Sequence, residues 1–106
     1  MKLSDFQMLE TETPKGVQAV LDFGEYTLSI VRNELSYGNK QGLYEIGMFD
    51  EDNKTMIEVP DITQEGDTVK GFLSETDVQN IIEKLKQKTG TNPVMIENDD
   101  VSIASA

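Results

Sequence analysis

Apolar and polar residues alternate through two neighbouring segments early in the chain. Alternation with a period of two is typical of β-strands that bury one face. Glycine adopts the positive φ of a tight turn at little cost, so Gly24 and Glu25 predict a two-residue turn between two strands. That turn pairs Leu21 with Leu28 and Ala19 with Ile30. The residues of the shared face are Val17, Ala19, Leu21, Phe23, Tyr26, Leu28 and Ile30.

Gly38-Asn39 predicts a second tight turn, which extends the second strand to about residue 37 and starts a third near residue 40. A bulge near Asn33 is an open alternative. With the tight turn, the third strand places Leu43, Gly47 and Phe49 on the first face and Tyr44, Ile46 and Met48 on the other.

Asp52-Asn53 predicts a third turn, because both residue types tolerate positive φ better than most. It pairs Met48 with Ile57 and Ile46 with Val59 in a strand that ends at Pro60. A loop over residues 61–67 and a short strand over residues 68–72 follow.

The strongest local signal in the chain predicts a helix over about residues 75–88. Ser74 and Asp77 have the spacing of a capping box, and Gly90 has the place of a C-terminal cap. The apolar stripe has helical spacing and consists of Val78, Ile81, Ile82 and Leu85. A weaker cap at Ser4 predicts a short helix over about residues 5–10, and residues 94–96 suggest a short strand.

These elements predict an α+β fold, with an antiparallel β-meander sheet of four to five strands, one C-terminal amphipathic helix packed on one face and a short N-terminal helix. We expect a single domain over residues 1–97 and a flexible acidic tail over residues 98–106. The length of 106 residues suits one domain.

The composition narrows the classes of function that are compatible with this chain. The net charge of −11 disfavours nucleic acid and anionic lipid as partners, although a basic protein stays compatible with it. The absence of cysteine and histidine removes thiolate chemistry and the usual general base near neutral pH. With no long apolar run and no signal-peptide pattern, we expect a cytoplasmic location.

No motif supports catalytic, cofactor-binding or metal-binding residues. The segment from Asp50 to Asp61 departs from the EF-hand pattern at Lys54, Thr55 and Asp61, so we interpret it as a solvated turn. Residues 38–42 lack the ending of a phosphate-binding loop. The three tyrosines lack the positive groove of a single-strand binder and are expected to pack across strands: Tyr26, Tyr37 and Tyr44.

The predicted registers leave the second face of the sheet largely apolar, which is unusual for a solvated antiparallel sheet. A homodimer that buries this face is the simplest cover, and folding of the chain termini over it is the alternative. The candidate interface consists of Val20, Val31, Tyr44, Ile46, Met48, Ile57 and Val59.

The leading hypothesis for function is therefore a non-enzymatic interaction or assembly module that self-associates through its sheet. The alternative is an acidic, DNA-mimicking antagonist of a basic nucleic-acid-binding protein. Seven carboxylates between residues 50 and 67, against the single lysine Lys54, motivate that alternative.

Overall fold

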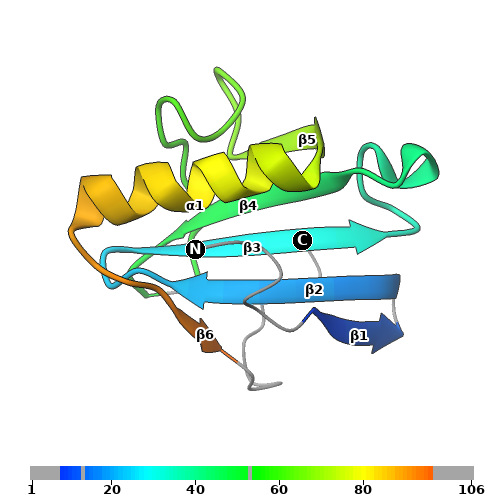
Figure 1. Cartoon of the computed structure of the whole chain (residues 1–106), viewed down its shortest axis with the longest axis horizontal. Helices are drawn as coiled ribbons and strands as arrows, with labels where there is room; N and C mark the ends of the chain where they lie inside the picture. The colour runs from blue at the N-terminus through cyan, green and yellow to red at the C-terminus, as the bar shows by residue number, and fades with distance from the viewer. Residues whose placement is uncertain (1–7, 13, 53, 97–106) are drawn as a thin grey trace.

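The computed structural model describes residues 8–12, 14–52 and 54–96, which form an antiparallel sheet with a helix on one side (Figure 1). The strands lie in the order β1-β2-β3-β4-β5, and β6 pairs with β2 on the edge that β1 also uses. The predicted α+β class, with a meander sheet and a C-terminal helix, is confirmed. The elements are β1 (Leu9–Glu12), β2 (Lys15–Asp22), β3 (Tyr26–Asn33), the 3₁₀ turn η2 (Asn39–Gln41), β4 (Tyr44–Asp50), β5 (Val69–Leu73), α1 (Glu75–Thr89) and β6 (Val94–Ile96).

The β2–β3 hairpin has the predicted register. Leu21 pairs with Leu28 and Ala19 pairs with Ile30. Gly24 has a φ of 89°, which a residue with a side chain rarely adopts, and the Phe23 N–H donates to the Tyr26 carbonyl at 2.9 Å. The tight turn therefore sets the register of the two longest strands.

The helix α1 also begins and ends where its caps predict. The Ser74 Oγ accepts from the Asp77 N–H at 3.1 Å, and an Asp77 carboxylate oxygen accepts from the Ser74 N–H at 2.9 Å. Gly90, with a φ of 68°, closes the C-terminus. The helix lies over one side of the sheet (Figure 1), where it contacts β4 and β5, and its four predicted residues Val78, Ile81, Ile82 and Leu85 are buried.

The strand β4 differs from prediction by one residue in its pairing with β3. Leu28 pairs with Met48 and Ile30 with Ile46, so these two β4 side chains face the helix, whereas the Gly38-Asn39 turn predicted the opposite face. A one-residue slip moves every side chain to the other face of a strand. The slip arises because β3 ends at Asn33 and residues 34–43 form an irregular loop instead of a two-residue turn.

The strand predicted between the Asp52-Asn53 turn and Pro60 is reduced to an isolated bridge. Its register is right, since Phe49 and Met56 form an isolated bridge and the Ile57 N–H donates to the Met48 carbonyl at 3.0 Å. The chain then turns away, and β5 takes the neighbouring position along β4. A turn that joins Val59 to Thr63 accounts for the departure, because the Val59 N–H donates to the Thr63 Oγ1 at 3.1 Å.

The predicted N-terminal helix is not confirmed. Leu9 and Glu10 belong to β1, which pairs with β2 through a turn in which the Thr11 Oγ1 donates to the Pro14 carbonyl at 2.7 Å. One helical turn is marginal alone, so pairing along a sheet edge outweighs it. Residues 5–7 of the predicted helix lie outside the described residues, and so does the predicted tail over residues 98–106.

The two faces of the sheet bury different kinds of side chain. The helix-covered face holds the main core, which includes Leu21, Leu28, Ile46 and Met48, each 0% exposed. The opposite face, called the second face below, carries a smaller apolar cluster of Val20, Phe49, Met56 and Ile96. Polar side chains also lie buried there, namely Gln18, Thr27 and Ser29.

Candidate interaction surface

The structure does not bring the seven candidate interface residues together. Val20 and Val31 are buried on the second face. The other five belong to the helix-covered core or pack against it, so the sequence-based grouping is wrong in position. Those five are Tyr44, Ile46, Met48, Ile57 and Val59.

The loop over residues 34–43 presents two large apolar side chains to solvent instead. Leu35 is 76% exposed and Tyr37 is 62% exposed. The loop starts with a tight turn, in which the Asn33 N–H donates to the Ser36 Oγ at 2.9 Å and the Leu35 N–H donates to the Asn33 Oδ1 at 2.9 Å. Because Asn33 and Ser36 are buried, this turn is anchored while its neighbours point outward.

A bulge in β5 presents a third exposed side chain beside them. Between the pairs Ile46–Lys70 and Tyr44–Leu73, two β5 residues, Gly71 and Phe72, oppose Glu45 alone. Phe72 has a φ of 58°, a left-handed conformation that is costly for a bulky residue, and it is 57% exposed. Bulges redirect side chains, and this one directs an aromatic ring outward.

The exposed rings of Tyr37 and Phe72 stack, with centroids 6.4 Å apart and an interplanar angle of 22°. The Phe72 N–H donates to the Tyr37 carbonyl at 3.4 Å. A Cβ added to Gly71 would lie 2.5 Å from the Tyr37 Cβ, so close contact between the loop and β5 requires glycine there. We call Leu35, Tyr37 and Phe72 the apolar rim.

A groove adjoins the apolar rim and encloses about 290 Å³. We call it the β3–β5 groove. Glu45 is its charged residue within the described chain, and burial raises the pKa of that carboxyl, with a further increase from the nearby Asp67 charge. The lining residues are Ser29, Val31, Leu35, Tyr37, Glu45, Ile46, Gly47, Met56, Thr68 and Val69.

A larger hollow of about 860 Å³ lies near the β1–β2 turn, and it has a different character. Its lining carries both signs of charge, from Lys15 and Arg32 and from three glutamates, Glu10, Glu12 and Glu34. The Arg32 guanidinium already lies 5.0 Å from the centre of the Tyr44 ring. Mixed charge and a cation held by an aromatic ring make this hollow less specific than the β3–β5 groove.

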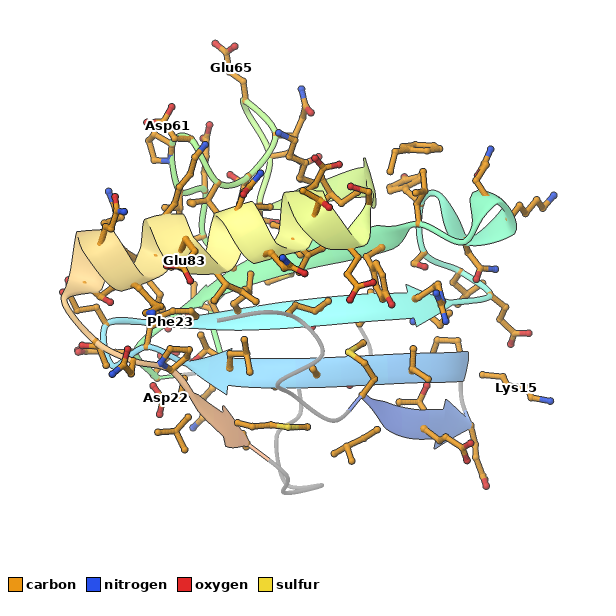
Figure 2. The ribbon with its side chains drawn as sticks, viewed as in Figure 1. Lys15, Asp22, Phe23, Asp61, Glu65 and Glu83 are labelled. Atoms are coloured by element: carbon orange, nitrogen blue, oxygen red, sulfur yellow. The ribbon has the colours of Figure 1, made fainter. Side chains whose placement is uncertain are left out.

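The segment over residues 51–68 joins β4 to β5, and we call it the acidic connection. Most of its described residues are exposed. Figure 2 shows Asp61 and Glu65 projecting from it, at a distance from Lys15. Near its start, the Asp52 Oδ1 accepts from the Lys54 N–H at 2.7 Å and from the Thr55 N–H at 3.2 Å. A hydrogen bond with Asp50 and these amide donors lower the pKa of Asp52, and the same carboxyl pairing raises the pKa of Asp50. These two carboxylates therefore have structural roles in the turn.

Two findings concern wider chemistry. In the residues that the structure describes, no three or more histidine, cysteine, aspartate or glutamate side chains gather as metal ligands would. Over the same residues, no helix has the length and apolar character needed to cross a bilayer.

The residues of the apolar rim and Glu45 were missed by sequence reasoning. Tyr37 was expected to pack across strands, yet it lies in a loop and is mostly exposed. The turn-forming residues around it, two glycines and two asparagines between Asn33 and Gly42, were the available signal that residues 34–43 leave the sheet. Phe72 gave no such signal, because its conformation depends on a bulge formed against Glu45.

Comparisons with known proteins place the chain in no family. No protein-family model matches it. Neither a curated protein nor a solved structure shows a significant match. Function is therefore inferred from the chain's own geometry.

Proposed function

We propose that this domain is a non-enzymatic interaction module that contacts a partner protein through the apolar rim. The observation that carries the proposal is the stacked, exposed pair Tyr37 and Phe72. Backbone strain of the kind found at Phe72 costs about 1–3 kcal/mol and concentrates at functional sites. Aromatic side chains are also enriched among the residues that contribute most to protein interfaces.

The position of the rim also favours contact with a macromolecule over binding of a small metabolite. Its rings lie on the outside of the domain, beside a groove whose 290 Å³ is at the lower end of small-molecule sites. An exposed apolar patch next to a groove of this size suits a polypeptide segment. Self-association stays part of the proposal, but the contact is now the apolar rim and not the second face. A cytoplasmic location stays a prediction.

Affinity capture from the native host with matched variants tests this proposal. We expect wild type to retain a partner that Phe72→Gly and Tyr37→Ser both lose. Glycine accepts positive φ, so Phe72→Gly removes the ring without adding strain. Val94→Ser is the control, because Val94 is 68% exposed and lies in β6, outside the apolar rim. Identical capture by all four proteins would refute the role of the rim.

The acidic connection supports a second candidate function, mimicry of nucleic acid toward a basic protein. Six of its carboxylates are exposed, namely Glu51, Asp52, Glu58, Asp61, Glu65 and Asp67. Binding by such a surface weakens steeply as salt rises, whereas apolar contact at the rim depends little on salt. Loss of capture by Phe72→Gly and Tyr37→Ser separates the two functions, because mimicry through the acidic connection does not require the apolar rim.

A further inference from the structure

We propose that the β3–β5 groove receives an arginine side chain from a basic, extended segment of a partner protein, with its guanidinium group paired to Glu45. This inference rests on the proposed function and identifies the chemistry of the partner. An apolar residue next to the arginine would cover the apolar rim. The evidence is the charge, lining and size of the groove.

The charge in the groove is negative and lacks a counterion from the described chain. Among the described residues that line the groove, Glu45 is the charged one, and none is a lysine or an arginine. Within the described residues, the N–H that donates to this carboxylate is that of Tyr37, at a long 3.4 Å. A carboxylate accepts several hydrogen bonds, so most of its capacity is available to a cationic ligand.

The apolar part of the groove suits the stem of a long cationic side chain. Val31, Met56 and Val69 line it, and so does Tyr37. Arginine fits better than lysine, because its planar guanidinium pairs with a carboxylate through two hydrogen bonds and stacks on aromatic rings. The volume of about 290 Å³ suits one side chain with its neighbouring backbone better than a larger ligand.

The charge of the whole chain favours the same ligand. A net charge of −11 attracts a basic segment over a long range, and Asp67 adds negative charge next to Glu45. A second copy of the chain is a poorer occupant, because it carries 20 acidic residues against nine basic ones. The charge complementarity therefore points to a different, basic protein.

The test measures binding of a synthetic peptide of alternating arginine and leucine, with fluorescence anisotropy at fixed salt. We expect Glu45→Gln to weaken binding by about tenfold or more, since loss of a partly desolvated ion pair has at least that effect. Glu65→Gln removes the same charge from an exposed position of the acidic connection and should change affinity less than about twofold. A peptide in which citrulline replaces every arginine should bind wild type no more tightly than the arginine peptide binds the Glu45→Gln variant.

The possible outcomes separate this inference from the proposed function. Equal weakening by Glu45→Gln and Glu65→Gln would mean general attraction to an acidic surface and would overturn the groove assignment. A dimer in light scattering that Glu45→Gln dissociates would make a second copy the occupant and would overturn it too. In either case the capture experiment with Phe72→Gly still decides the role of the rim. The urea midpoint of Glu45→Gln serves as the folding control.

Discussion

The two faces of the sheet are both buried, but they achieve burial by different means. On the helix-covered face, α1 lays four apolar residues over apolar strand residues, and the main core is continuous. On the second face, the buried apolar residues Val20, Val31 and Phe49 lie beside a buried polar pair, Gln18 and Ser29. In that pair the Gln18 Nε2 donates to the Ser29 Oγ at 3.0 Å.

A buried sheet face therefore need not be an apolar one. A polar group costs little to bury when it is hydrogen-bonded. The hydrogen bond between Gln18 and Ser29 meets this condition on the second face. An apolar face without cover demands a partner, whereas a face of mixed character does not. The homodimer predicted from the sequence thus loses its original argument, and self-association becomes a question for the apolar rim.

The largest predicted effect follows from the position of Ile46 on the helix-covered face. Ile46→Lys would bury an unpaired ammonium group under α1, which costs several kcal/mol and rivals the whole stability of a small domain. We expect the variant to be unfolded in circular dichroism at 25 °C. Ile46→Val, which removes one methyl group, should cost about 0.5–1.5 kcal/mol and serves as the control.

The competing outcome for Ile46→Lys is informative. If Ile46 lay on a dimer interface, as the sequence suggested, the lysine variant would remain folded and only its mass in light scattering would fall. A folded, monomeric Ile46→Lys protein would therefore contradict the observed register of β4.

Features of the fold that depend on neighbouring residues could be predicted from the sequence. The Gly24-Glu25 turn, the Ser74–Asp77 capping box and the Gly90 cap each involve residues close together in the chain. The β3–β4 register could not, because a loop of residues 34–43 transmits no fixed register between the strands it joins. Its start depends on the Ser36 Oγ, which accepts from the Asn33 backbone N–H, and on the Asn33 Oδ1, which accepts from the Leu35 N–H.

The candidate site depended on tertiary structure even more strongly. Phe72 is exposed because β5 bulges opposite Glu45, and Tyr37 reaches it because Gly71 leaves room for close contact. These residues are distant in sequence, and the positive φ of a phenylalanine contradicts local preference. A pattern of apolar and polar positions carries no information on such contacts.

The second prediction probes the polar pair of the second face. Ser29→Ala leaves the Gln18 amide without its acceptor and should cost about 1–3 kcal/mol of unfolding free energy in urea. The double variant Gln18→Met with Ser29→Ala removes both partners and should recover most of that loss. If the double variant loses as much unfolding free energy as Ser29→Ala and Gln18→Met lose together when made singly, hydrogen bonding does not explain burial of this face.

The third prediction concerns α1, which covers the helix-covered face. Ser74→Ala removes the side-chain cap of α1 and should lower the unfolding free energy by about 1 kcal/mol. Thr76→Ala is the matched control, because Thr76 is exposed within the helix and alanine favours helix at that position. An unchanged urea midpoint for Ser74→Ala would show that the cap does not hold the start of the helix.

The smallest predicted effect is the pH dependence of the same cap. Hydrogen bonds from the Ser74 backbone N–H and side chain lower the pKa of Asp77, with a smaller contribution from Lys70. A carboxyl whose pKa is lower in the folded state stabilises the fold above its unfolded pKa of about 4, and this stabilisation is lost as pH falls through the folded pKa. Asp77→Asn should therefore be less stable than wild type at pH 7, and the two urea midpoints should converge on acidification.

Lys84→Gln, farther along the helix, should show no such convergence. A difference between Asp77→Asn and wild type that stays constant down to low pH would show that the Asp77 charge does not contribute to the cap, and that the Ser74 hydroxyl alone fixes the start of α1.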